Sequence, residues 1–299
     1  MWLLFAFLGP LAWAVSTHID KYLVDRYFRD SDTAVLMVFT SLLGLSFLPF
    51  IALLQPGVFA PSLKAIAVMT ATGVLYMGAM LFYLRAIQSE EASAVAPLFQ
   101  GTTLFGFALA WLLLGEVLSR QAAAGAVLIV AGVLTVSLGR GARFKPRVVF
   151  GMAACTFILA LANVLFKFYA IETDFWVTTF WTFVGEALFG FAIMALPSYR
   201  RHFVHLVKTH TGALLGVNGA NELINLGGGL GVRYAMLLAP VAVVSAVAST
   251  TTLFVFAIGT GLSLFAPQLS QEDVSRANLL RKAAAAAIVT AGVLLARQG

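Results

Sequence analysis

Ten stretches of apolar sequence, each about as long as a membrane-crossing helix, dominate the chain. A helix needs roughly 20 apolar residues to cross the hydrocarbon core of a bilayer. The apolar residues run continuously instead of alternating with polar ones, which excludes a β-barrel. We therefore expect an all-α integral membrane protein with ten transmembrane helices. The expected crossings are 2–24, 33–54, 64–87, 93–114, 121–138, 148–170, 175–196, 211–235, 239–265 and 276–296.

The composition supports this class and limits where function can reside. Of 299 residues, 61% are hydrophobic and only 11% are charged, which is more apolar surface than a soluble domain can bury. No connecting loop is long enough to hold a soluble domain, so any function lies between the helices. The net charge of +6 is carried mostly by short loops, where basic residues act as topology determinants. We therefore expect a lipid bilayer as partner and no nucleic acid.

Cysteine and histidine are too sparse for a metal or disulfide framework. Cys155 is the single cysteine and lies in an apolar run. His202, His205 and His210 share the segment after Tyr199, which we interpret as a basic loop and not as a metal site. We expect no metal and no cofactor.

An internal repeat divides the chain into two halves. Thr103-Leu104-Phe105 recurs 149 positions later as Thr252-Leu253-Phe254, and a similar shift pairs Lys21 with Lys167. Each half then holds five crossings. Because five is odd, the halves must have opposite orientations, a recurring architecture of secondary transporters with the site at the repeat interface. We expect a first repeat at 1–139, a basic linker at 140–147 and a second repeat at 148–299.

The eighth crossing carries the most polar helix face. Asn218, Asn221, Glu222 and Asn225 follow the spacing i, i+3, i+4 and i+7, so they share one face. An ionised side chain at the centre of a membrane helix costs about 2.5–3.5 kcal/mol even on lenient scales, so it faces a partner or a wet cavity. We interpret this face as one wall of a substrate site. A structural hydrogen-bond ladder between helices is the alternative.

Three further polar residues of the second half are candidates for the same site. Asn163 and Lys167 share a face of the sixth crossing, and Glu186 lies in the seventh. Glu222 and Glu186 are the candidates for carrying a coupling proton, because burial disfavours the charged form of a carboxyl group. The alternative is a structural ion pair that holds helices together, between Lys167 and Glu186 or between Lys167 and Glu222.

Aromatic residues of both halves could line this cavity. The candidates are Trp13, Tyr76 and Trp181, for each of which simple packing or interfacial anchoring is the alternative role. The group around Asp20 falls near the end of the first crossing. It has two open interpretations, a site role or an interfacial position.

The third to fifth crossings resemble the EamA-type transporters of the drug/metabolite transporter superfamily. The resemblance is strongest from Ala96-Pro97-Leu98 to Gly115-Glu116-Val117-Leu118-Ser119. The other matching residues are Tyr83, Ala86, Gln121, Gly125 and Gly132. The second half departs from the pattern, with Phe265 in place of the glutamate and Ala246 in place of the proline. The resemblance implies transport of small solutes such as amino acids, and a structural role for Gly115 and Glu116 at a helix end.

The expected function is secondary transport of small polar metabolites such as amino acids or amines, by alternating access, with proton coupling or exchange. One alternative is a flippase of a lipid-linked or amphiphilic solute, and another is a non-transporting membrane scaffold. An enzyme lacks support, because no HExxH, GxSxG or Walker A motif is present. We expect a multi-pass protein of the cell membrane, monomeric or homodimeric. Its orientation stays open, because charge bias places the termini outside and the resemblance places them in the cytoplasm.

Overall fold

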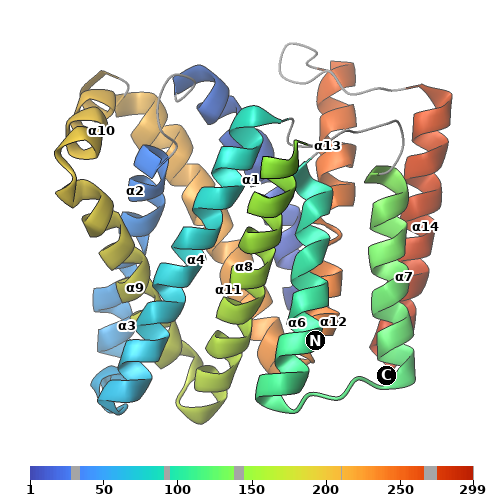
Figure 1. The fold of residues 1–299 in the computed structure, drawn as a ribbon, viewed down its shortest axis with the longest axis horizontal. Coiled ribbons are helices and arrows are strands. Elements are labelled where there is room, and N and C mark those ends of the chain that lie inside the picture. Colours follow the sequence, from blue (N-terminus) through green and yellow to red (C-terminus); the bar gives the residue numbers. More distant parts are fainter. Residues whose placement is uncertain (28–33, 91–94, 138–144, 210, 266–274, 299) are drawn as a thin grey trace.

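A computed structural model describes residues 1–27, 34–90, 95–137, 145–209, 211–265 and 275–298 of the chain. The regular structure in these ranges is helical, without strands. Both chain ends lie in the lower half of Figure 1. Most of the expected linker, 140–147, lies outside the described residues.

Within its described residues, the first half contains six α-helices and three short 3₁₀ helices. The second expected crossing, 33–54, is broken because Pro49 stands near the start of α3 and cannot donate a backbone hydrogen bond. The elements are α1 (Trp2–Tyr27), α2 (Ala34–Leu43), η1 (Gly44–Phe47), α3 (Leu48–Leu54), η2 (Pro56–Phe59), α4 (Leu63–Ser89), η3 (Ala96–Gln100), α6 (Gly101–Leu114) and α7 (Arg120–Ser137).

The second half has longer helices and one π-helical segment. The expected crossing at 239–265 is divided in two around Ser249 and Thr250. The elements are α8 (Pro146–Glu172), α9 (Phe175–Ala195), α10 (Pro197–Thr209), the π-helix (Gly212–Asn218), α11 (Gly219–Leu238), α12 (Val241–Ala248), α13 (Thr251–Phe265) and α14 (Arg276–Gln298).

Within the described ranges, seven helical stretches are long and apolar enough to cross a membrane. Two shorter apolar helices, Leu98–Leu114 and Arg120–Gly132, correspond to the fourth and fifth expected crossings. The expected crossing at 211–235 is not among these seven stretches, because its hydropathy is too low. Its asparagines, Glu222 and Arg233 lower its hydropathy, and these same groups give α11 its polar face.

The segment after Tyr199 is a helix, so its interpretation as a loop is wrong. α10 lies at the upper left of Figure 1, between α9 and the π-helix. Phe203 and Leu206 share one face of α10. Leu206 is buried, and the Phe203 ring packs on Phe39 of α2 at 4.6 Å between ring centroids. The spacing of these apolar residues was the signal for a helix. His210 lies outside the described residues.

Small residues permit the closest helix contacts. α7 and α14 lie side by side at the right of Figure 1. A methyl group added at Gly125 of α7 would meet the backbone of Gly292 and Ala296 on α14. Lipid tails provide no hydrophobic drive between helices, so close backbone packing supplies the association. This agrees with the small-residue character of both helices.

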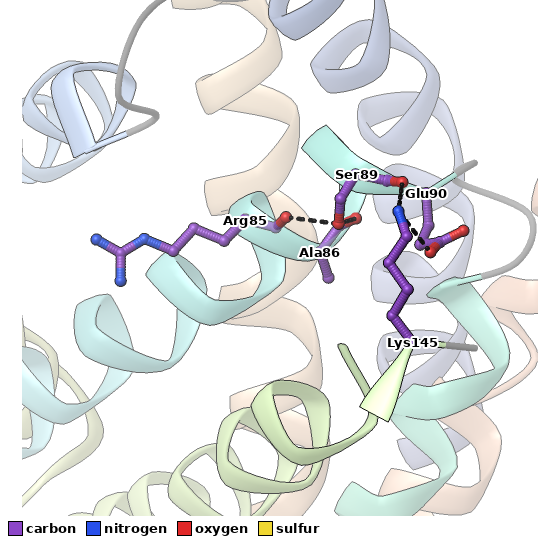
Figure 2. A network of polar contacts seen from close by, with 5 residues as sticks. All are labelled: Arg85, Ala86, Ser89, Glu90 and Lys145. Carbon is purple, nitrogen blue, oxygen red and sulfur yellow. Dashed lines mark hydrogen bonds and ion pairs between the residues drawn. The ribbon is translucent and has the colours of Figure 1, made fainter. Parts of the chain in front are cut away.

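The start of the second half contacts the end of α4. Figure 2 shows Lys145, which precedes α8, donating to the Ser89 carbonyl at 3.4 Å. Its Nζ also lies 3.5 Å from the Glu90 carboxylate. Because the Lys145 side chain is 65% exposed, this contact is screened by solvent and contributes little stability.

Candidate functional site

A cavity of about 220 Å³ lies between helices of both halves. Its wall is mostly apolar and aromatic, with a small set of polar side chains, as is usual for small-molecule sites. The polar and aromatic residues on the wall include Trp13, Asp20, Thr40, Tyr76, Tyr83, Asn163, Glu186, Glu222, Asn225, Arg233 and Ser249. Six of the ten predicted site residues are among them, namely Trp13, Tyr76, Asn163, Glu186, Glu222 and Asn225.

Glu222 lies on the cavity wall and is only 6% exposed. It stands on α11, and its Oε1 accepts a hydrogen bond of 2.6 Å from the hydroxyl of Thr40 on α2. Asn225, one turn further along α11, lies on the same wall. Glu222 is therefore held by a neutral donor from the opposite half of the chain.

The other two amides of the polar face lie off the cavity wall. Consecutive residues on an α-helix point about 100° apart, so Asn221 and Glu222 cannot both face the centre of the cavity. Asn221 turns toward α1 and donates a hydrogen bond of 2.7 Å to Oδ1 of Asp20. Asn218 ends the π-helix, and its buried side-chain amide has no partner within the described part of the chain. Neither is placed to touch a solute directly.

Asp20 is a cavity residue that we left between two interpretations. It is 8% exposed, and it accepts hydrogen bonds from Asn221 at 2.7 Å and from the Tyr83 hydroxyl at 3.5 Å. It belongs to the cavity wall, which favours the site role. Trp13, Thr17 and Asp20 share one face of α1, and all three line the cavity.

Glu186 is paired with Arg233, a residue of α11 that was not among the predicted site residues. The Glu186 carboxylate lies 3.5 Å from the Arg233 guanidinium, and both side chains are nearly buried. Arg233 also stacks over the rings of Tyr76 and Phe166, each at 5.1 Å from the ring centroid. The arginine therefore neutralises Glu186 and makes two cation–π contacts.

Lys167 lies off the cavity wall, and neither expected ion pair is present in the described structure. Its Nζ lies 2.6 Å from Glu116 and donates to the Ala239 carbonyl at 2.9 Å. Glu116 in turn accepts a hydrogen bond from the backbone of Val241 at 2.9 Å. The long side chain of Lys167 reaches the ends of α6 and α11, away from Glu186 and Glu222. These contacts favour a structural role for Lys167.

Trp181 also lies away from the cavity. Its indole N–H donates to the Val58 carbonyl at 2.7 Å, and the ring packs edge-on against Phe180 and Phe59. It holds the short helix η2 (Pro56–Phe59) against α9. Packing, the alternative role, is what this geometry supports.

Two helix breaks border the cavity. One lies between η3 and α6, close to Phe99 and Thr102, and the other lies between α12 and α13, close to Ser249 and Thr251. Several buried hydroxyl groups nearby have no hydrogen-bond partner among the residues that the structure describes. Those on the cavity wall belong to Ser16, Thr102 and Ser245. Such groups are available to a solute or to water.

No group of three or more histidine, cysteine, aspartate or glutamate residues in the described ranges could hold a metal ion. The polar and aromatic groups on the cavity wall are carboxylates, hydroxyls, amides, aromatic rings and the Arg233 guanidinium. These groups can bind and release a solute by hydrogen bonding and charge.

Comparison with known proteins agrees with this architecture. None of the curated proteins matches the chain. The whole chain is similar to a protein of solved crystal structure with 16% identity and a TM-score of 0.65, over 99% of this chain and 95% of that one. At this identity the likeness shows the fold alone.

Comparison with models of protein families found a match over the first half of the chain. Residues 1–138 match the EamA-like transporter family, as the motif from Ala96 to Ser119 indicated. The family consists of membrane transporters, which is consistent with the expectation of a multi-pass protein that is not an enzyme. Over residues 1–138, the chain is therefore similar to the EamA-like transporter family.

Proposed function

We propose that the chain is a secondary transporter that moves small polar metabolites, such as amino acids or amines, through the central cavity by alternating access. Proton coupling or exchange would drive it. The observation that carries this proposal is a cavity with buried carboxylates, placed between two sets of helices that each contain a break at the cavity wall. Discontinuous helices at a mid-membrane site are a recurring feature of secondary transporters.

The breaks support two inverted five-helix repeats, 1–139 and 148–299. A shift of 149 positions, the one that aligns Thr103 with Thr252, sends the start of α6 at Gly101 onto Thr250, next to the start of α13. The two helices are therefore interrupted at equivalent positions. We propose ten crossings, with α2 to α3, η3 to α6 and α12 to α13 each forming one discontinuous crossing.

Helix contacts support the same symmetry. α1 packs on α11, and the equivalent pair is α8 on α4, which is also in contact. Likewise α6 packs on α8, and α13 packs on α1. The contact of α7 with α14 maps onto itself, as expected for helices beside a two-fold axis.

The paired lysines give a third, independent argument. Lys21 donates to the Ile87 carbonyl at 3.2 Å, near the end of α4, and Lys167 donates to the Ala239 carbonyl at 2.9 Å, just after α11. Each lysine binds backbone carbonyls at a helix end, where a positive charge is favourable. Lys21 and Lys167, which the proposed repeat makes equivalent, thus make the same kind of contact.

The cavity lies within one chain, so a single subunit is sufficient for transport whether the protein is a monomer or a homodimer. We propose the cell membrane as its location. Glu222 and Glu186 are the proposed proton carriers. The Arg233 pair gives Glu186 a structural task as well, so Glu222 is the stronger candidate.

The test is transport by the purified protein in proteoliposomes, with a broad panel of labelled metabolites and with and without a pH gradient. We expect uptake of at least one small polar solute, and loss of that uptake or of its pH dependence in Glu222→Gln. Glu90→Gln is the matched control, because Glu90 lies in the solvent-exposed contact of Figure 2. Absence of uptake for every solute, or unchanged uptake across pH in Glu222→Gln, would contradict the proposal.

A further inference from the structure

We infer that the transported solute is a small organic cation whose ammonium group binds between Asp20 and Glu222. This rests on the proposed transport function and narrows its substrate to one charge class. It also brings Asp20, a residue of the first half, into the binding site.

The charge of the cavity wall is the first argument. Among the described residues, the charged side chains on the wall are Asp20, Glu186, Glu222 and Arg233. Arg233 is paired with Glu186, so these two charges cancel. Two carboxyl groups remain, and no lysine or arginine in the described ranges forms an ion pair with either of them. Their partners are the neutral donors Thr40, Asn221 and Tyr83.

The relative position of the two carboxyl groups is the second argument. Asp20 on α1 and Glu222 on α11 line the same small cavity, and Asn221, the residue before Glu222, donates a hydrogen bond of 2.7 Å to Asp20. Removing one partner from a buried charge is costly, and two buried like charges are costlier still. A positive group between them relieves both penalties, whereas a carboxylate solute would add a third negative charge. The site therefore selects a cation against an anion.

The aromatic wall is the third argument. Trp13, Tyr76, Tyr83 and Phe99 line the same cavity, and Tyr83 packs on Phe99 at 5.3 Å between ring centroids. Aromatic faces attract cations and also receive the apolar body of an amine. The volume of about 220 Å³ is below the range of about 300–1,000 Å³ found for drug-sized ligands, which limits the solute to a small one.

Protons and the ammonium group compete for the same two carboxyl groups. The titratable and charged groups around them come from four helices and are Asp20 on α1, Tyr76 and Tyr83 on α4, Glu186 on α9, and Glu222 and Arg233 on α11. Since the Glu186–Arg233 pair is internally neutral, protonation of Asp20 and Glu222 decides the charge of the site. Lower pH should therefore weaken binding of the cation, and a pH gradient could drive exchange of cation for proton.

The experiment uses three labelled probes that share one ring and differ in charge, with the full-length protein in nanodiscs. Tyramine is a cation, tyrosine a zwitterion and 3-(4-hydroxyphenyl)propionate an anion. Equilibrium dialysis should show binding of tyramine and no saturable binding of the anion. Asp20→Asn and Glu222→Gln should each weaken tyramine binding by about tenfold or more, because each removes a charged partner. Glu90→Gln should bind as the parent protein does.

Thermal unfolding of each variant separates loss of binding from loss of folding. If Asp20→Asn does not fold, Glu222→Gln and the fall in tyramine affinity with decreasing pH carry the test. Binding of the anion as tightly as the cation, or tyramine binding unaffected by Glu222→Gln and by pH, would overturn the inference.

The two proposals fail in different ways. Transport of other metabolites without binding of any cation would overturn the cation site and leave the transport function standing. Binding of tyramine in nanodiscs without movement across proteoliposomes would keep the cation site and contradict transport. If neither binding nor transport occurs with the probes and the metabolite panel, both are wrong.

Discussion

Lys167 Nζ lies 2.6 Å from the carboxylate of Glu116, and this ion pair joins the end of α6 to α8. The pair also fixes the turn between α11 and α12, because Lys167 binds the Ala239 carbonyl and Glu116 binds the Val241 amide. The two side chains are only 9% and 16% exposed. The contact thus connects the two halves of the chain at a site where water screens it poorly.

Removing one partner of this pair should destabilise the fold strongly. Glu116→Gln or Lys167→Met leaves an uncompensated, poorly solvated charge, for which we expect a loss of about 3–5 kcal/mol. The measurement is thermal unfolding in detergent with a thiol-reactive dye. Cys155 is the single cysteine and is fully buried, so the dye reports unfolding.

The matched control is the Lys145–Glu90 contact of Figure 2. Its distance is 3.5 Å and Lys145 is 65% exposed, so Lys145→Met should cost about 0–1 kcal/mol. Equal losses in Lys145→Met and Lys167→Met would show that the Lys167 pair is not a special stabilising contact.

Two glycines control the approach of α4 to α9. A methyl group added at Gly73 would collide with the Thr182 carbonyl, and one added at Gly185 would collide with the Thr70 carbonyl. We expect Gly73→Ala and Gly185→Ala each to destabilise the protein by about 1–3 kcal/mol, as overpacking does. Both helices carry cavity residues, so ligand affinity should fall as well.

Gly78 provides the control on α4 itself. An added methyl group there meets nothing within 4 Å, so Gly78→Ala should be neutral or stabilise the helix by about 0.5–1 kcal/mol. Unfolding temperatures measured side by side test this contrast. If Gly73→Ala is as stable as Gly78→Ala, the helices can separate at no cost, and the close contact does not hold them.

The Arg233–Glu186 pair predicts a specific non-additivity. Arg233→Met strands the Glu186 carboxylate in the cavity, and Glu186→Gln strands the guanidinium, so each single variant should lose stability. The double variant should recover part of the loss, because it leaves neither charge unpaired. A double-mutant cycle on unfolding temperature measures the coupling. Additive losses would mean that each residue interacts with something other than its partner.

The same double-mutant cycle, measured by ligand binding, distinguishes a structural role of Glu186 from a role in ligand recognition or proton coupling. If Glu186 only neutralises Arg233, the double variant should bind the solute as well as the parent protein does. If Glu186 carries the coupling proton, binding or transport in the double variant should lose its pH dependence while stability recovers.

Helix-length apolar runs were sufficient to predict the membrane-length helices of the described structure, and the motif around Gly115 and Glu116 predicted the match to the EamA-like family over residues 1–138. Gly115 ends α6 in the left-handed conformation with φ of 66°, so the predicted position of this pair at a helix end is confirmed. The polar face of the eighth crossing predicted that Glu222 faces a cavity. These features depend on local sequence, which is why they could be found without coordinates.

The partners of the charged side chains could not be predicted in the same way. Whether Lys167 reaches Glu116, Glu186 or Glu222 depends on which helices are neighbours, and periodicity within one helix does not give that. Asn221 and Glu222 belong to one polar face, yet they point to different neighbours because 100° separates them on the helix. Arg233 lies near the end of its helix. At such a position the sequence pattern does not distinguish a charged residue that faces the loop from one that faces the cavity.

Thr40 offers the mildest test of the cavity. Its hydroxyl donates 2.6 Å to Glu222, and hydrogen bonds to charged groups contribute about 1.5–3 kcal/mol. Thr40→Val keeps the shape of the side chain but removes the hydrogen-bond donor to Glu222. The affinity of the Glu222 carboxyl group for a proton and for a bound cation should therefore change. We expect ligand affinity to change by about 10- to 100-fold. Thr40→Ser retains the hydroxyl and should bind as the parent protein does. The measurement is equilibrium dialysis of both variants against one ligand. Equal affinities of the two variants would mean that the Thr40 hydroxyl does not affect how Glu222 binds the ligand.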